Sequence, residues 1–186
     1  VALQPGRRDG LPVLTDDALV THFGPRHRLI VIGAGAAGMM CAAVAAQRGR
    51  SVVLIDHASK LAEKIRISGG GRCNFTNRRV GPENFISANP HFAKSALAGY
   101  TPDDFLALIK RYGIAWHEKH RGQLFCDESS EDIINLLRTE CELGGVQWRM
   151  PCSVDEIATL DLGDGQGFKL SLSQDGSLST VNVSSL

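Results

Sequence analysis

The sequence predicts an α/β fold organised around a βαβ unit of the Rossmann type. Three observations, in order along the chain, predict it: an aliphatic strand that starts at Arg28, a glycine-rich turn that opens a helix of small residues, and a second aliphatic strand that ends at Asp56. The chain has 186 residues, of which 43% are hydrophobic and 22% charged, so its composition is that of an ordinary globular protein.

The two strands of this unit have the composition of strands that are buried on both faces. RLIVIG (residues 28–33) and SVVLID (residues 51–56) lack polar alternation, which is typical of a parallel sheet covered on both sides. Between them GAGAAG turns the chain into MMCAAVAAQRG, whose alanines favour a helix, and Gly49 should end that helix.

The middle of the chain predicts helices and a hairpin. NPHFAKSALAGY predicts a helix from near Pro90, and TPDDFLALIKRYG predicts a second helix with Thr101 as its N-cap and Gly113 at its end. AWHEKHRGQLFC predicts a hairpin that turns near Arg121 and Gly122.

The last part of the chain predicts one more helix and then strands. In SSEDIINLLRTECELGG, Ser129 and Asp132 have the spacing of a capping box, and Gly144 should stop the helix. VQWRM, SVDEIAT, FKLSLS and STVNV then predict an antiparallel β-meander. Residues 1–27 show no sustained periodicity, and we expect a flexible extension with a short helix around Asp16 to Val20.

Charge and cysteine content limit the possible partners. Lys plus Arg and Asp plus Glu number 20 each, so no overall field attracts nucleic acid or an anionic membrane, and we expect a small-molecule substrate with neither partner. The five cysteines contain no C-x-x-C pair and no zinc-type spacing, which predicts no metal site and a reducing, cytoplasmic compartment. No segment has the pattern of a membrane span or a secretory signal.

GAGAAG is a G-x-G-x-x-G motif placed between a predicted strand and a predicted helix. Gly33 permits the tight turn, Gly35 lets a diphosphate approach the backbone, and Gly38 lets the helix pack closely on the strand. Asp56 ends the second strand, where an acid accepts hydrogen bonds from an adenosine ribose. The alternative is a turn that serves only packing, with Asp56 solvated.

A second glycine-rich segment, KIRISGGGRCNFTN (residues 64–77), follows the strand that bears the acid. Three consecutive glycines could pass against a flat or anionic surface, with Lys64, Arg66 and Arg72 as nearby cationic donors. A purely structural loop is the alternative. Cys73 could be a reactive thiol beside Arg72, but a small buried side chain is the commoner role of such a cysteine, and we expect packing. No histidine is assigned a catalytic role, and the catalytic residues are unknown.

VIGAGAAGMMCA and VVLIDHASKLAEKIRISGGGRCNFTN resemble the opening of the YhiN-like family of FAD-dependent oxidoreductases, also called the aminoacetone oxidase family, some of whose members are bile-acid steroid reductases. The resemblance covers roughly residues 28–154, and SGGGRCN is its most specific part. It implies bound FAD, with the ADP half over the first glycine turn and the flavin approached by the second glycine segment. The cofactor-binding residues so implied are Gly33, Ala34, Gly35, Ala36, Ala37, Gly38, Asp56, His57, Lys64, Ser68, Gly69, Gly70, Gly71, Arg72, Cys73, Asn74 and Val154.

The resemblance also implies a division of the chain. Residues 28–186 would be a partial FAD-binding domain: 28–80 the βαβ unit and glycine loop, 81–145 a helical and hairpin insertion, and 146–186 strands. Family members are longer, so the chain is expected to be the N-terminal part of a flavoenzyme, inactive alone, that transfers electrons from NAD(P)H to a small organic substrate. An NAD-binding dehydrogenase domain and a non-catalytic nucleotide-binding or redox-sensing module are the alternatives. The oligomeric state cannot be read from the sequence.

Overall fold

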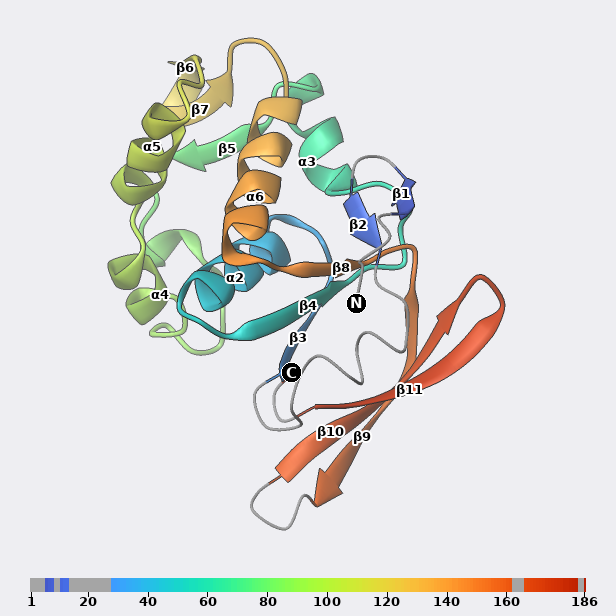
Figure 1. Cartoon of the computed structure of the whole chain (residues 1–186). Helices are drawn as coiled ribbons and strands as arrows, with labels where there is room; N and C mark the ends of the chain where they lie inside the picture. The colour runs from blue at the N-terminus through green and yellow to red at the C-terminus, as the bar shows by residue number, and fades with distance from the viewer. Residues whose placement is uncertain (1–5, 9–10, 14–27, 162–165, 184–185) are drawn as a thin grey trace. The chain divides into compact units, whose positions relative to one another are not determined.

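The computed structural model describes residues 6–8, 11–13, 28–161, 166–183 and 186 (Figure 1). The short helix expected around Asp16 to Val20 lies outside the described residues. The chain divides into two compact units, one formed by residues 1–62 with 137–186 and the other by residues 63–136. Among the described residues, no helix is long and apolar enough to cross a membrane.

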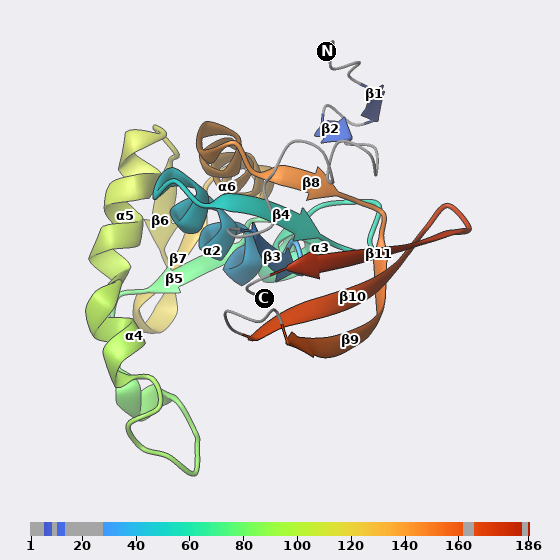
Figure 2. The same cartoon turned by 60° about the horizontal axis from the view of Figure 1, so that its bottom comes forward.

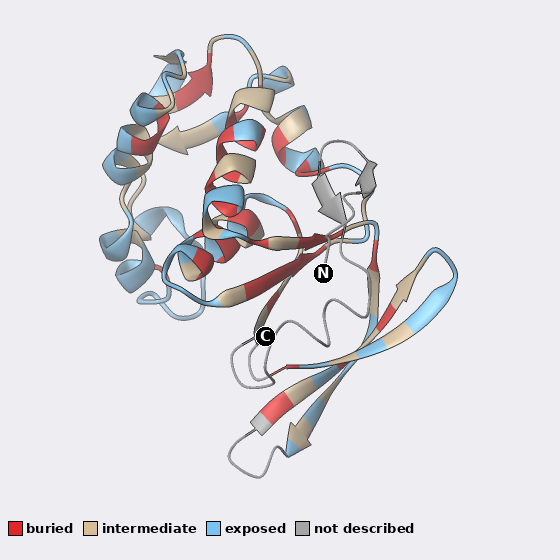
Figure 3. Cartoon of the chain, viewed as in Figure 1, coloured by how far each residue is buried: buried red, intermediate tan, exposed pale blue. Residues whose placement is uncertain are grey.

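The first unit contains a five-stranded sheet in the order β1-β2-β8-β4-β3. Its strands are β1 (Gly6–Arg8), β2 (Leu11–Val13), β3 (Arg28–Ile32), β4 (Ser51–Ile55) and β8 (Gln147–Arg149). Strands β3 and β4 are parallel, with Leu29 opposite Val52, and helix α2 (Ala36–Gln47) connects them. Four consecutive residues of β4 are buried, as the unbroken aliphatic pattern predicted (Figure 3). The predicted βαβ unit is confirmed.

Strand β8 corrects one prediction. VQWRM was expected in the meander, but β8 pairs in parallel with β4, placing Trp148 opposite Leu54. Trp148 and Arg149 are both buried, because the strand follows a helix and enters the middle of the sheet. A three-residue strand is too short to show whether its hydrophobic pattern alternates, so the sequence did not separate the two arrangements.

The meander itself is confirmed for the last three strands, which lie side by side in Figure 2. Strands β9 (Ser153–Asp161), β10 (Gln166–Gln174) and β11 (Ser177–Val183) are antiparallel, in the order β11-β10-β9. Asp175 and Gly176 both have positive φ, as a two-residue hairpin turn requires. Residues from β10 and β11 share a buried cluster with Cys152 and with residues from β3 and β4, which joins the meander to the parallel sheet. The cluster consists of Ile30, Val53, Ile55, Cys152, Leu170, Leu172 and Val183.

Helix α2 packs closely on the last turns of helix α6 (Glu131–Gly144). A Cβ on Gly144 would lie 2.7 Å from the Ala46 Cβ, so only glycine permits this approach. Gln47 Nε2 donates to the Glu140 carbonyl (2.9 Å) and to its carboxylate (2.8 Å). The helix ends one residue later than predicted, since Gly145 rather than Gly144 adopts the positive φ of a terminating glycine.

The second unit is built on a three-stranded antiparallel sheet in the order β5-β7-β6. Its strands are β5 (Asn74–Asn77), β6 (Trp116–Glu118) and β7 (Gln123–Cys126), and its helices are α3 (Glu63–Ile67), α4 (Lys94–Gly99), α5 (Pro102–Arg111) and the first turns of α6. Short 3₁₀ turns cover Ser68–Gly70, Pro82–Asn84 and His120–Gly122. The predicted hairpin is confirmed, with positive φ at Arg121 and Gly122.

Helix α5 begins as predicted. The Thr101 Oγ1 accepts from the Asp104 N–H (3.2 Å), and the Thr101 N–H donates to the Asp104 carboxylate (2.8 Å). The Thr101 hydroxyl also donates to the Asp104 carboxylate (2.6 Å). This bond, followed by the bond from the Thr101 N–H, lowers the pKa of Asp104, because both favour its ionised form. Helix α4 starts at Lys94 rather than near Pro90; residues 91–93 form a turn instead.

Candidate dinucleotide site and glycine loop

The first glycine turn is held to the sheet by its own backbone. Gly33 has φ +102°, and its N–H donates to the Ile55 carbonyl at 2.8 Å. A Cβ on Gly38 would fall on the Gly33 carbonyl oxygen, so a side chain at that position is excluded by main-chain atoms. Both glycines therefore have the structural roles predicted from the motif.

Gly35 differs from its two neighbours in the motif. It is the N-cap of α2 with φ −85° and ψ −174°, a conformation open to any residue, and a Cβ there would meet nothing within 4 Å. No side chain caps the helix, and its first turn contains no acid. Residues 35–37 are exposed, so the first N–H groups of the helix and the positive end of its dipole, about half an elementary charge, are open to a ligand. This is the arrangement that binds a phosphate.

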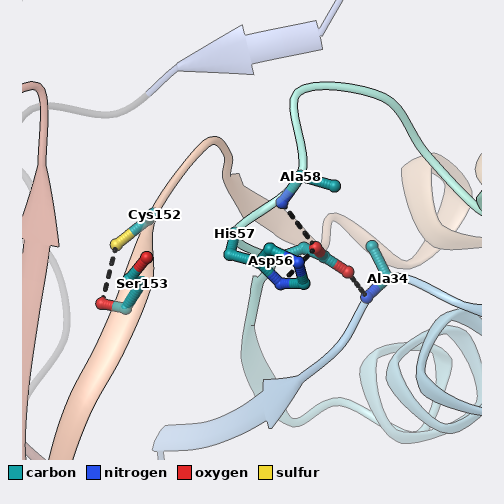
Figure 4. Close-up of polar contacts among 6 residues, drawn as sticks. All are labelled: Ala34, Asp56, His57, Ala58, Cys152 and Ser153. Carbon is teal, nitrogen blue, oxygen red and sulfur yellow. Dashed lines mark hydrogen bonds and ion pairs between the residues drawn. The ribbon is translucent and has the colours of Figure 1, made fainter.

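Asp56 lies directly beside this turn (Figure 4). Its Oδ2 accepts from the Ala34 N–H (2.5 Å), and its Oδ1 accepts from the Ala58 N–H (2.8 Å). Its own N–H donates to the Arg149 carbonyl (3.2 Å), and its carbonyl accepts from the Cys152 N–H (2.8 Å). The side chain is 14% exposed, so the carboxylate is fixed but still reachable. Each carboxylate oxygen has a further lone pair, which leaves capacity for a ribose hydroxyl.

His57 and Val154 lie at the margin of this group. His57 is 84% exposed, with its Nδ1 3.4 Å from the Asp56 carboxylate. Val154 is on β9, an edge strand of the meander, and its side chain packs on the buried cluster. An edge strand presents main-chain groups that β10 does not use, which suits the predicted contact of the Val154 backbone with a base.

The second glycine segment belongs to the 63–136 unit and uses its glycines for the fold. Gly69, Gly70 and Gly71 all have positive φ (+60°, +67° and +86°). A Cβ on Gly69 would lie 2.6 Å from the Phe125 ring, whereas Gly70 and Gly71 face open space. Within its own unit, therefore, the closest neighbour of the triplet is an aromatic ring of the chain. Contact of this loop with a cofactor stays a prediction.

Hydrogen bonds anchor the glycine loop at both ends. The Ser68 carbonyl accepts from the N–H groups of Gly71 (3.1 Å) and Cys73 (3.0 Å), and the Ser68 Oγ accepts from the Asn74 N–H (3.3 Å). The Gly71 carbonyl accepts from the Ser130 N–H at 2.7 Å. Lys64, Arg72 and Asn74 are exposed, so these polar side chains remain available to a ligand.

Cys73 is buried, and its burial raises the pKa of the thiol to about 11. At neutral pH the sulfur is therefore a thiol rather than the nucleophilic thiolate. Cys126 and Cys141 are also buried, with pKa values raised to about 12 chiefly by desolvation. The geometry supports the packing role predicted for Cys73.

Comparison with known sequences identifies the family. The HI0933-like protein Rossmann domain matches residues 27–183, which is most of the chain. The chain belongs to this family of FAD-binding Rossmann domains. Membership confirms the resemblance and the α/β fold drawn from the sequence.

Two curated relatives share high identity with this chain. It is 53% identical to the ribosomal RNA dihydrouridine synthase of Escherichia coli over 147 residues, 79% of this chain and 36% of that protein. It is 50% identical to the enzyme of the same name from Haemophilus influenzae, over 69% of this chain and 32% of that protein. A 3-dehydro-bile acid delta(4,6)-reductase of Clostridium scindens is 27% identical over 61% of this chain and 28% of its own length. The chain spans about a third of these relatives.

Solved structures agree on the fold. Thermovibrio ammonificans THI4 matches with a TM-score of 0.57 at 9% identity, over 90% of this chain and 56% of that one. AlpK matches with a TM-score of 0.54 at 17% identity, over 87% of this chain and 30% of that one. At these identities the likeness shows the architecture alone.

The relatives correct the expected partner. A small-molecule substrate and no nucleic-acid partner were expected from the balanced charge, but the Escherichia coli and Haemophilus influenzae relatives are both named for ribosomal RNA. The expectation was wrong because net charge averages over the whole chain and does not show local concentrations of basic residues.

The structure also shows site residues that the sequence did not reveal. Ala58 supplies the second N–H to Asp56, and Phe125 lies against Gly69. Any residue type except proline can donate a backbone hydrogen bond, so the sequence does not indicate Ala58. Phe125 is distant from the loop in sequence, so its contact with Gly69 could not be predicted either. The motif itself indicated only the residues whose identity the turn requires.

Proposed function

We propose that this chain is the FAD-binding part of a larger flavoprotein that reduces uridine in ribosomal RNA to dihydrouridine, with NAD(P)H as electron source, in the cytoplasm. The observation that supports it most is the 53% identity to an enzyme of that name, together with the open, uncapped start of α2 beside Asp56. Uridine, NAD(P)H and one proton would yield dihydrouridine and NAD(P)⁺, which balances the reaction.

The described residues fit FAD. The uncapped N–H groups from Gly35 onward would bind the diphosphate, since no side chain occupies that space. Asp56 would accept a hydrogen bond from the ribose, and the Val154 backbone would meet the adenine. We also propose that Lys64 and the loop from Ser68 to Asn74 approach the flavin.

FAD, when bound, supplies a ring system that accepts electrons from a nicotinamide and passes them to an organic acceptor. The chain's own part is to bind and orient. The main-chain N–H groups of Ala34 and Ala58 hold Asp56 in one position. The burial of Cys73 raises the pKa of its thiol to about 11, so the side chain is a neutral thiol at neutral pH, which suits a packing role.

The first test asks whether the chain binds FAD. The purified chain should take up added FAD and then show the visible absorption of a bound flavin. Gly35→Asp should abolish this uptake, because a carboxylate would occupy the phosphate position and repel the diphosphate. Gly35→Asn is the matched control: it has the same size without the charge and should retain more FAD. Equal retention by wild type and Gly35→Asp would place the diphosphate elsewhere.

The second test asks about the substrate. A chimera in which this chain replaces the matching segment of the Escherichia coli relative should restore dihydrouridine to the ribosomal RNA of cells that lack that enzyme, measured by mass spectrometry of digested RNA. A chimera that binds FAD and is reduced by NAD(P)H but leaves the RNA unmodified would refute the assignment of an RNA substrate. A chimera that binds only NAD would favour the dehydrogenase alternative.

A further inference from the structure

We propose that an exposed group of basic side chains in the 63–136 unit binds the phosphate backbone of the RNA; this rests on the proposed function. This basic cluster comes from the turn after β5 and from the β6–β7 hairpin. Its members are all exposed: Arg78, Arg79, Lys119, His120 and Arg121. The two segments lie about forty positions apart in the sequence, so the cluster exists only in the folded chain.

Hydrogen bonds between the two turns bring these residues together. The Arg78 N–H donates to the Gly122 carbonyl (2.9 Å), and Asn77 Nδ2 donates to the Arg121 carbonyl (3.1 Å). Asn77 Oδ1 also accepts from the Arg79 N–H (2.8 Å). A Cβ on Gly122 would lie 2.8 Å from Asn77 Oδ1, so the turns are in direct contact. The cluster therefore sits on a fixed backbone.

The cluster is positive even though the chain as a whole is neutral. One carboxylate opposes it: Glu118 lies 3.4 Å from Arg78. The remaining permanent cations, Arg79, Lys119 and Arg121, have no carboxylate partner among the ion pairs found in the described part of the chain. Uncompensated exposed cations are what an RNA backbone requires, because each one neutralises a phosphate and releases a counterion.

Aromatic rings hold two of the cations. The Arg78 guanidinium lies 5.2 Å from the centre of the Trp116 ring, and the Lys119 ammonium lies 4.1 Å from the centre of the Phe125 ring. Long side chains lose rotamer entropy on binding, and a ring that already restrains them reduces that loss.

The backbone conformation of Arg121 is the strongest support for the proposal. It has φ +58°, a conformation that suits glycine and strains arginine. The fold alone would favour glycine at this position, and an arginine there places a cation at the tip of the hairpin at a cost in stability. Strain of this kind is commonly retained where a side chain has a function.

Arg121→Gly provides the test, since it removes the cation and relieves the strain. The full chain would be titrated into a fluorescein-labelled RNA hairpin with a uridine-containing loop. Arg121→Gly should bind several-fold more weakly, with an unchanged or higher melting temperature. The slope of log affinity against log salt should fall by about 0.7 to 0.9. Arg79→Gln with Arg121→Gly should weaken binding about tenfold. Lys94→Gln with Lys110→Gln changes two exposed cations elsewhere in the unit and should leave the affinity within about twofold.

Three outcomes would overturn the proposal: unchanged affinity in the Arg79 and Arg121 variant, equal weakening in the Lys94 and Lys110 control, or binding to anionic phosphatidylglycerol vesicles in place of RNA.

The chimera separates this proposal from the proposed function. Dihydrouridine formed at the same rate with and without the cluster would leave the function standing and reject the surface. If the chimera binds RNA through the cluster but forms no dihydrouridine, the surface is supported and the proposed function is rejected.

Discussion

Gly35, in the first glycine-rich segment of this chain, differs from the three glycines of the second segment in its backbone conformation and its surroundings. At the start of α2, Gly35 has an ordinary backbone conformation, and a Cβ there would meet nothing within 4 Å, so the fold does not require glycine and the space suits the proposed diphosphate. In the loop from Ser68, all three glycines have positive φ, and Gly69 lies against Phe125. There the missing side chains serve the fold. A glycine's backbone angle and free space, rather than its identity, separate the two uses.

The largest effect is expected from a substitution at Gly38, because a side chain there would overlap main-chain atoms of Gly33. Gly38→Ala should destabilise the chain by about 3 kcal/mol and abolish FAD uptake, because the turn and the start of α2 must separate. Urea unfolding followed by circular dichroism, with flavin absorbance on the same sample, measures both. Wild-type stability in this variant would contradict the close contact between Gly38 and the Gly33 carbonyl.

A smaller effect is expected in the glycine loop. Gly70→Ala meets no neighbour and should cost about 1 kcal/mol from its positive φ alone. Gly69→Ala adds the contact with the Phe125 ring and should cost about 2 kcal/mol. Since the two substitutions are otherwise matched, the difference between them in urea unfolding isolates the ring contact. Equal losses would show that Phe125 yields freely.

A further difference between the two regions lies in their cysteines. Cys41, on α2, is exposed, whereas Cys73 is buried. At pH 8 a thiol reagent should modify Cys41 rapidly and leave Cys73 unmodified until the chain unfolds. Burial raises the pKa of Cys73 from 9.0 to about 11. The unfolded chain therefore releases the Cys73 proton at a lower pH than the folded chain does. For this reason the free energy of unfolding keeps the full contribution of the protonated thiol below pH 9 and loses it as the pH rises to about 11.

Unfolding measurements at pH 7.5 and pH 10 would test this linkage. The wild type should lose stability at the higher pH, and Cys73→Ser should lose less. The variant should still take up FAD as the wild type does. Rapid modification of Cys73 in the folded chain at pH 8 would contradict the packing role.

The sequence predicted those parts of the structure that local patterns determine. The aliphatic runs of β3 and β4, the G-x-G-x-x-G turn and the Thr101 cap each depend on neighbouring residues, and each is confirmed. Strand β8 was misplaced because three residues do not reveal their pairing partner. The contacts of Phe125 with Gly69 and of Asn77 with Arg121 join distant segments, which a single sequence does not specify. The predicted contacts with a cofactor remain predictions.

The packing of α2 on the end of α6 has a consequence for affinity. Three contacts along one side of α2 restrain it: the Cys141 thiol to the Met39 carbonyl, Gly144 against Ala46, and Gln47 to Glu140. These contacts oppose rotation of the helix about its axis, and so they favour one direction of its leading amides before any anion binds. The proposed diphosphate would therefore meet donors that are already aligned, and its binding would not have to supply the free energy of aligning them.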